Sequence, residues 1–503
     1  MTAVDWSVLV GYFVLMVLIG VWSRTKIKTV VDYFTTGGRI PWWLSGISHH
    51  MSGYSAVMFV AFAAVAYTYG ITVYVWWAMT IGVGVGIGAF LFAARWNRLR
   101  AKHGVVSPLE YLARRYNIPT QQALAYSGAA LKVVDIASKW VAIAVLLNGF
   151  TGVPIRWGIL LTGVVTMLYA TLGGLWADVL TDFGQFVIQF GAGVAMFVGV
   201  LAHLDGVPTL WKMWDQLPAG HGDALNGPYT PIFLTAFLFI KTFEYNGGMW
   251  NLAQRYMAAP SGSAAKKSAL LSSVLWLVWP LILFVPMCAA PLLVQPGKAE
   301  QSYVALAQLL LPTGLIGLVL AGFFSHTMAM VASDANAISS VITRDLAPVL
   351  VPRVRRLADA ATLKMARIVT FTFVTVSMLI AIATNGEGVV LKIVVDLVAA
   401  TMGPIAIPLM LGLLPWFRRS GSRAALASWA IGLITWAIVK YGVGSTDTTL
   451  VVALPLATSL VVYVGLGLLL PESRADVDEL VESLNTDPDE TDEVAARRSA
   501  ALS

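Results

Sequence analysis

The sequence predicts an all-α polytopic membrane protein, and composition and hydrophobic pattern both support this fold class. Of the 503 residues, 58% are hydrophobic and only 12% are charged, with a mean hydropathy of +0.75. A soluble domain has about 45–50% apolar and about 25% charged residues, so a water-soluble globule and a disordered chain are excluded. The apolar runs are long enough for about 20 helical residues each, whereas the strands of an outer-membrane barrel alternate in ~10-residue segments.

A window of about 19 residues finds thirteen candidate transmembrane helices. They lie at 4–23, 42–69, 72–95, 121–147, 154–172, 178–201, 230–253, 268–295, 314–341, 365–384, 390–416, 424–440 and 449–470. The first has no basic region before it and no small-residue cleavage site, so we expect a retained helix rather than a signal peptide. The single cysteine, Cys288, excludes a disulfide within the chain.

Lysine and arginine gather in alternate loops. They are frequent at 24–41 and 96–120, and again around 255–267, 344–364 and 418–423, while the loops between hold almost none. The positive-inside rule places these loops in the cytoplasm. The sequence therefore predicts a cytoplasmic (inner) membrane protein with its N-terminus outside and its C-terminus inside. The net charge of +6 comes from basic residues that flank the predicted membrane spans rather than from one basic surface stripe. It therefore gives no reason to expect a nucleic-acid partner.

The last 33 residues, 471–503, differ in composition from the rest. They hold ten acidic residues against three arginines and no long apolar stretch. We expect this acidic tail to be a solvated cytoplasmic extension, and we assign it no role.

Two of the predicted spans contain polar, glycine-containing stretches at matching depth. The first runs from 49 to 55 within the span 42–69, and the second from 241 to 248 within 230–253. Backbone that is not helical at membrane depth is tolerated only where it lines a cavity, and in secondary transporters such breaks form substrate and ion sites. The alternative is that glycine and serine only allow close helix packing.

The two interrupted spans lie five apart, which predicts an inverted five-helix repeat. The first repeat is 42–201 and the second is 230–416. The remaining parts are an extra helix and cytoplasmic loop at 1–41, an extracellular loop at 202–229, two C-terminal helices at 417–470 and the tail at 471–503.

Several ordered motifs carry a resemblance to a known family. They are Asp32-Tyr33-Phe34 with residues 37–43, residues 107–112 with Arg115-Tyr116, Tyr169, residues 173–175, residues 181–185, Gln254-Arg255-Tyr256, and Ser339-Ser340 with residues 343–346. In these features the sequence resembles the sodium:solute symporter family, which includes proline, sialic acid and sugar cotransporters. The resemblance implies the amino-acid and sugar symporter fold, alternating access, a small-molecule solute as partner and Na⁺ or H⁺ as coupling ion without an organic cofactor. A monomer is sufficient for this mechanism.

The resemblance also implies a sodium site, and the sequence departs from it. In the family this site combines backbone carbonyls at the first break with two adjacent hydroxyls and a carbonyl on a later helix. The matching hydroxyl positions are Ala329 and Met330, and the carbonyl position is His326. Because hard cations prefer oxygen ligands, we expect a degraded sodium site.

A second cation position is implied by the same resemblance. Asp182 is retained, and in some relatives the equivalent carboxylate forms a second sodium site with hydroxyls one turn further along. Those positions are Ala332 and Ser333, followed by Asp334.

Other ionisable residues at membrane depth are candidates by default, because burying them there is costly. Lys132, Asp135 and Lys139 share one helical face. Lys132 can supply a fixed positive charge in place of a cation; the alternative is a structural ion-pair network. The resemblance places Asp135 where sialic acid carriers have an arginine, which argues against a simple anionic substrate.

Histidines at 49, 50 and 326 lie near the implied sodium position. Imidazole titrates near neutrality, so proton coupling is an alternative to sodium coupling. The other alternative for these histidines is that they are hydrogen-bonding helix contacts.

Aromatic residues suggest the substrate. The resemblance matches Tyr245 to a residue that covers the bound ring in sugar carriers, and Trp76, Trp77, Asn246 and Trp250 are candidates to line the same cavity. Aromatic faces with a few hydrogen-bonding groups suit a sugar or polyol. Tryptophan is also a common interfacial anchor, and amino acids, nucleosides and small acids stay open as substrates.

The sequence therefore predicts a cation-coupled secondary active transporter, and not an enzyme, since no HExxH or GxSxG motif is present. The alternatives are a proton-coupled or uncoupled transporter of an amino acid or other small metabolite, and a transporter-like sensor. The candidate substrate-binding residues are Ser52, Gly53, Tyr54, Ser55, Trp77, Asp135, Glu244, Tyr245 and Asn246. The candidate coupling residues are His50, Met51, Lys132, Asp182, His326, Ser333 and Asp334.

Overall fold

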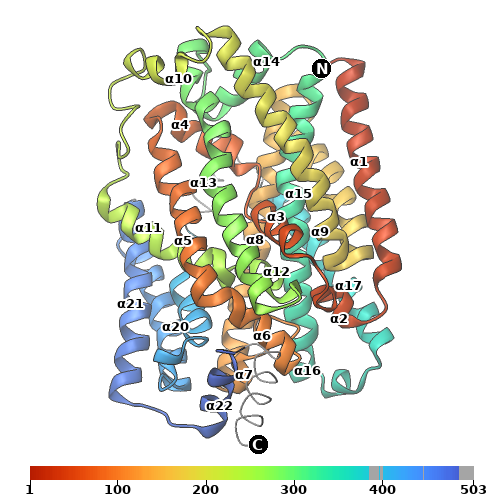
Figure 1. Ribbon diagram of the computed structural model, residues 1–503, viewed down its shortest axis with the longest axis vertical. Helices are drawn as coiled ribbons and strands as arrows, with labels where there is room; N and C mark the ends of the chain where they lie inside the picture. Colours follow the sequence, from red (N-terminus) through yellow and green to blue (C-terminus); the bar gives the residue numbers. More distant parts are fainter. Residues whose placement is uncertain (385–395, 397–399, 401, 446, 487–503) are drawn as a thin grey trace, which may run out of the picture.

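The computed structural model describes residues 1–384, 396, 400, 402–445 and 447–486. Within these ranges every regular element is a helix, and eight helices are long and apolar enough to cross a membrane. The long helices lie side by side along the longest axis, with the start of α1 at one end and α22 at the other (Figure 1). The all-helical membrane class is confirmed. The total of thirteen spans stays a prediction, because much of 390–416 lies outside the described residues.

Four of the long helices begin with side-chain caps from threonine, asparagine or serine. Thr2, Asn117, Thr230 and Ser261 each accept a hydrogen bond from a first-turn amide of α1, α8, α11 or α13. The long helices are α1 (Ala3–Ser23), α8 (Ile118–Thr151), α9 (Ile155–His203), α11 (Pro231–Phe243), α13 (Gly262–Leu293), α15 (Leu315–Val341), α17 (Asp359–Ala383), α20 (Ser422–Ala437) and α21 (Thr448–Leu469). Shorter ones are α2 (Val30–Thr35), α3 (Trp42–Met51), α4 (Ala63–Tyr69), α5 (Thr80–Gly88), α6 (Ala94–His103), α7 (Leu112–Arg115), α10 (Thr209–Lys212), α12 (Asn251–Ala258), α14 (Ser302–Leu310), α16 (Ala347–Leu350), α19 (Ile407–Leu411) and α22 (Ala475–Ser483).

The helix α9 is 49 residues long but folds back on itself at Gly174, where φ is +48°. Contacts with α1 fix the direction of both arms. A Cβ atom at Gly20 would lie 2.4 Å from Tyr169, and Gln185 donates to the Tyr12 hydroxyl at 3.2 Å. Both arms therefore run back along α1 from the bend, which divides α9 into the two predicted spans 154–172 and 178–201.

Both predicted interruptions are present. The first helix stops at Met51, and a π-helical stretch resumes at Met58–Phe62. The second stops at Phe243, passes through Gly247 at φ +137°, and resumes as α12. The relation of the two regions as an inverted repeat stays a prediction.

The start of the acidic tail is docked on one face and solvated on the other, so the expectation of a wholly solvated extension is wrong for 472–486. The helix α22 buries an apolar face against the rest of the protein, formed by Val477, Leu480, Val481 and Leu484. Arg98 and Lys102 of α6 donate to backbone carbonyls of Leu484 and Ser483 at 2.8 and 2.9 Å. The i, i+3, i+4, i+7 spacing of the apolar residues explains the docking. Residues 487–503 lie outside the described part of the chain.

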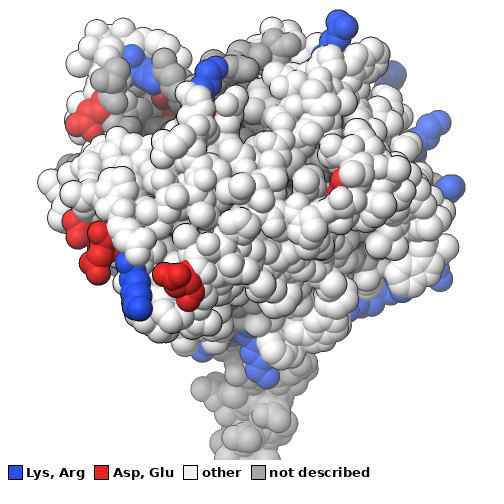
Figure 2. Space-filling view, turned by 90° about the horizontal axis from the view of Figure 1, so that it is seen from above, with Lys and Arg blue, Asp and Glu red and all other residues white. Residues whose placement is uncertain are grey.

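The end of the molecule at which α1 begins is mostly uncharged (Figure 2). Most charged side chains visible on this face lie toward its rim, and an acidic one shows farther in (Figure 2). This arrangement is the one that the predicted topology requires of an extracellular face. Which end faces the cytoplasm stays a prediction.

Candidate functional site

An aromatic cluster surrounds the first break. The Tyr54 ring stacks on Trp276, with centroids 4.2 Å apart and planes 5° from parallel. The rings of Trp77 and Tyr245 lie edge-on to the same Trp276 indole, with ring centroids 5.2 and 5.3 Å from it. A Cβ atom at Gly53 would lie 2.6 Å from Trp276 and 2.7 Å from Tyr245. Glycine at 53 is therefore what lets these rings meet at the break.

The Tyr245 hydroxyl donates to the Gly53 carbonyl at 3.1 Å, but five other polar atoms of this aromatic cluster and the adjoining histidines have no partner among the described residues. They are the Tyr54 hydroxyl, the Trp276 indole Nε1, both ring nitrogens of His50 and Nδ1 of His326. The His50 and His326 rings lie 4.8 and 4.9 Å from the Tyr54 ring. All four side chains are fully buried. Because an unpaired buried polar group is costly, such a set of donors and acceptors is typical of a ligand site.

Some candidate residues are held by the protein itself. The Glu244 carboxylate accepts from Lys241 Nζ at 2.6 Å. The Asn246 amide donates to the carbonyls of Gly84 and Thr242 at 2.9 and 2.8 Å. His49 hydrogen-bonds Ser272 Oγ and the Tyr245 carbonyl at 2.8 and 2.9 Å. These three side chains have packing partners, whereas Gly53, Tyr54, Trp77, Tyr245, His50 and His326 come together.

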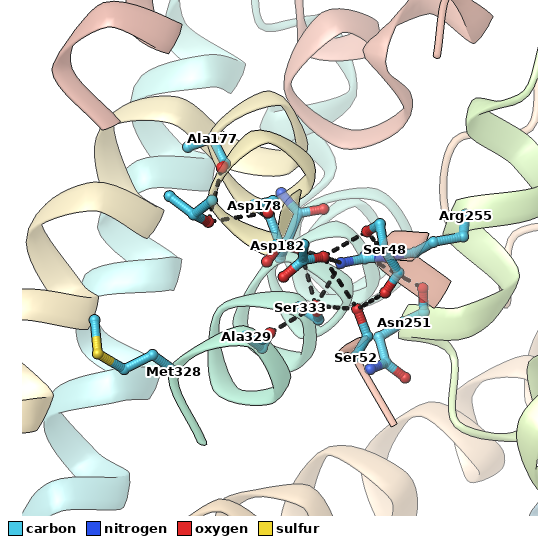
Figure 3. Close-up of polar contacts among 12 residues, drawn as sticks. Ser48, Ser52, Ala177, Asp178, Asp182, Asn251, Arg255, Met328, Ala329 and Ser333 are labelled. Carbon is cyan, nitrogen blue, oxygen red and sulfur yellow. Dashed lines mark hydrogen bonds and ion pairs between the residues drawn. The ribbon is translucent and has the colours of Figure 1, made fainter. Parts of the chain in front are cut away.

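A second group, which we call the acidic cluster, lies between α3, α9, α12 and α15. Asp178 and Asp182 are one turn apart on α9, and the Arg255 guanidinium pairs with Asp178 directly and with Asp182 at 3.5 Å. Ser48, Ser52 and Ser333 complete the acidic cluster (Figure 3). All three charged side chains are fully buried.

The three serines join the helices around these carboxylates. Ser48 Oγ donates to Asp182 at 2.5 Å, and Ser333 Oγ donates to Asp178 at 2.9 Å. The hydroxyls of Ser52 and Ser333 are hydrogen-bonded to each other at 2.9 Å. The α3 helix and its break are thereby tied to α9 and α15 through side chains that surround the carboxylates.

The acidic cluster is not charge-balanced. Two carboxylates share one guanidinium, which leaves an excess of one negative charge when both are ionised. Asp178 Oδ1 and Asp182 Oδ1 also have no hydrogen-bond partner among the described residues. An unbalanced buried charge is strongly unfavourable unless something neutralises it. Oxygen ligands with excess negative charge suit a hard monovalent cation or a proton.

Sequence reasoning found only part of the acidic cluster. It selected Ser52, Asp182 and Ser333 but not Asp178, and it counted Arg255 among the charges of a cytoplasmic loop. That assignment of Arg255 is wrong, because its side chain is 0% exposed. The positive-inside rule assigns an arginine to a loop from its position in the sequence. Arg255 lies instead on α12, where its side chain is buried inside the protein. The Gln254-Arg255-Tyr256 motif was the available signal.

Trp276 was also missed. It lies in the uninterrupted apolar span 268–295, where a tryptophan gives no local sign of a site.

The implied sodium position has no side-chain oxygen at Ala329 or Met330. The Ala329 carbonyl lies 2.8 Å from Ser333 Oγ, one turn along α15, and is the alternative acceptor to Asp178 for the single hydroxyl hydrogen. A hydroxyl of α15 that contacts the break near this position is that of Thr327, which accepts from the Ala56 amide at 2.9 Å. Met51 is fully buried at the end of α3 and Ser55 is buried within the break.

The third group, which we call the charge ring, joins α8 to α15. Lys132 Nζ lies 2.9 Å from Asp334 and 3.4 Å from Asp135. Lys139 Nζ lies 2.8 Å from Asp135 and 3.3 Å from Asp334. The predicted ion pairs along α8 are confirmed, and Asp334 closes the ring. Its two cations and two anions balance.

Comparison with known proteins identifies the family. Residues 33–432 match the model of the sodium:solute symporter family. The chain belongs to this family. Among the relatives of this symporter, the sodium/sialic acid symporter of Proteus mirabilis is 23% identical over 473 residues, covering 87% of this chain and 90% of that protein. The sodium/glucose cotransporter of Vibrio parahaemolyticus is 24% identical over 380 residues, covering 68% of each.

A solved structure shares the fold of this symporter. It is that of a Na⁺-coupled sialic acid symporter in a substrate-bound, outward-open state. The TM-score is 0.81 at 21% sequence identity, and the match covers 94% of this chain and 99% of the other. The protein is therefore a multi-pass membrane symporter of the sodium-coupled solute class, and not an enzyme.

Proposed function

We propose that this symporter carries a neutral sugar or polyol across the cytoplasmic membrane. The observation that supports this most directly is the Tyr54–Trp276 stack with its unpartnered polar edges. Flat aromatic faces pack against a sugar ring, while hydroxyl, indole and imidazole groups pair with its hydroxyls. The rings that contact the stack are those of tyrosine, tryptophan and histidine. The amine of Lys241, 5.3 Å from the Tyr245 ring, is already paired with the Glu244 carboxylate and so offers no free charge to a solute.

The coupling cation is proposed to bind at the acidic cluster. Its excess negative charge and its two unpartnered carboxylate oxygens favour cation binding there. Ala329 and Met330 offer no side-chain oxygen at the usual position. Lys132 is a weaker candidate to replace the coupling cation, because Asp135 and Asp334 already neutralise its positive charge within the charge ring. At the acidic cluster the permanent positive charge comes from Arg255, which pairs with both carboxylates.

The substrate proposal is tested by ligand-induced stabilisation of the purified full-length protein. Hexoses, inositol, sialic acid, amino acids and organic acids are compared in Na⁺ and in choline. A ligand that binds only the native state at 100 times its Kd stabilises by about 2.7 kcal/mol. We expect a sugar or polyol to raise the unfolding temperature. Stabilisation by amino acids or organic acids alone contradicts the proposal, and binding without uptake identifies a sensor.

The aromatic cluster is tested by Trp276→Phe. This change keeps a ring but removes the indole N–H and part of the contact area, so the half-saturation concentration for uptake should rise roughly tenfold. The maximal rate should stay within about twofold. The matched control is Trp429→Phe on α20, whose indole donates to Ser127 at 3.1 Å. Equal effects of both changes contradict a substrate role for the aromatic cluster.

The coupling proposal is tested by uptake into proteoliposomes. A Na⁺ gradient is compared with choline at constant pH, and with a proton gradient. We expect saturable Na⁺ dependence that Asp182→Asn abolishes. Uptake that follows only the proton gradient, or neither gradient, contradicts sodium coupling through the acidic cluster.

A paired gain-of-site variant addresses the usual sodium position. Ala329→Ser with Met330→Ser restores the missing hydroxyls, so the Hill coefficient for Na⁺ should rise. An unchanged coefficient contradicts the interpretation that these two positions account for the degraded site.

A further inference from the structure

The acidic cluster and the charge ring lie on two faces of the same helix. Ser333 and Asp334 are consecutive on α15, yet Ser333 donates to Asp178 while Asp334 accepts from Lys132 and Lys139. Their Cα atoms are about 3.8 Å apart. Asp334, which contacts both lysines of the ring, is thus the chain neighbour of the serine that contacts Asp178.

Packing alone is a weak reason for four charges between α8 and α15. Replacing buried ion pairs by well-packed apolar residues is often neutral or stabilising, and charged side chains at membrane depth are costly. Asp334 and Lys139 are nevertheless almost fully buried, with side chains 1% and 3% exposed. The presence of these charges beside the acidic cluster suggests a role in the electrostatics of that site.

We propose that the charge ring sets the cation affinity of the acidic cluster, with Lys132 and Asp334 as positioning residues. Asp334 fixes the face of α15 so that Ser333 Oγ meets Asp178. The balanced ring adds no net charge beside a site that already carries one excess negative charge. This inference rests on the proposed binding of the cation at the acidic cluster.

The proposal gives opposite signs for two single substitutions. Asp334→Asn leaves the ring with one excess positive charge and weakens cation binding. Lys132→Gln leaves one excess negative charge and strengthens it. At a separation on the order of 10 Å and an effective dielectric constant of about 20, one unit charge changes binding about tenfold. The double variant restores the balance and returns the affinity to within about threefold of the unaltered protein.

The experiment titrates Na⁺, with choline to hold ionic strength, and follows the unfolding temperature of the purified full-length protein. The half-saturating Na⁺ concentration should rise about tenfold in Asp334→Asn and fall about tenfold in Lys132→Gln. The matched control is Lys440→Gln, which also removes a lysine from an ion pair, with Asp396, but in the π-helical stretch Ile438–Gly442 that continues α20. It should leave the Na⁺ response unchanged.

The results separate this inference from the proposed function. Shifts of the same sign in both ring variants, or a double variant worse than either, show a purely structural ring and overturn the inference. Where a single variant fails to fold, a double variant that folds with unaltered Na⁺ affinity supports it, and one with lost affinity overturns it. A Na⁺ response that survives Asp182→Asn overturns the proposed coupling site itself.

Discussion

The acidic cluster and the charge ring are both largely buried groups of opposite charges that contact α15, but they differ in balance. In the ring each lysine contacts both carboxylates, and each carboxylate contacts both lysines. In the acidic cluster two carboxylates share Arg255, and one oxygen of each is unpartnered among the described residues. Burial alone therefore does not mark an ion site. The proposed ion site is distinguished by its excess charge and its unpaired oxygens.

The largest expected effect comes from removing Arg255. Arg255→Met leaves two neighbouring carboxylates buried without a counter-charge, and breaking a buried pair costs about 3–5 kcal/mol. We expect a loss of about 5 kcal/mol in the free energy of unfolding, measured by denaturant titration in detergent micelles, together with loss of uptake.

The control for Arg255 removes one anion as well. Arg255→Met with Asp178→Leu returns the acidic cluster to one excess negative charge and should recover most of the stability. A double variant as unstable as the single one would show that packing of the arginine, rather than charge, dominates this region.

The ring should respond differently to the same treatment. Lys139→Met alone leaves three charges and should cost about 3 kcal/mol, because one carboxylate is then under-compensated. Lys139→Met with Asp135→Leu keeps the balance and should stay within about 1 kcal/mol of the unaltered protein in the same titration. A large loss of unfolding free energy in the paired variant would contradict the interpretation that the charge ring differs from the acidic cluster in its charge balance.

Local signals in the sequence predicted the framework of both regions. The i, i+3, i+7 spacing placed Lys132, Asp135 and Lys139 on one face, and the polar stretch 49–55 marked the first break. These signals survive folding because helix periodicity and long apolar runs are decided within a few turns.

The missing members required tertiary information. Arg255 lies 77 residues from Asp178 in sequence, and nothing near either residue states that α12 and α9 meet. Trp276 comes from a uniformly apolar helix. In the tail, the acidic composition suggested a solvated segment, although the helical spacing of apolar residues such as Val477 and Leu480 indicates an apolar face on α22.

The smallest effect belongs to an Arg–Asp pair in water. Arg474 and Asp476 contact each other at 2.5 Å, but their side chains are 38% and 63% exposed. Hydrogen bonds from Arg474 hold the pKa of Asp476 below its ordinary value. The pair's contribution is therefore present above the unfolded pKa of about 3.9 and is lost as the pH falls through the lowered folded value.

Solvent screening limits what that contribution can be. Asp476→Asn should change the free energy of unfolding by less than about 0.5 kcal/mol at neutral pH, and by still less in high salt. The same titration used for Arg255→Met measures it. If Asp476→Asn lowered the free energy of unfolding as much as Arg255→Met, an Arg–Asp pair would contribute equally in this protein whether it is buried or exposed to solvent.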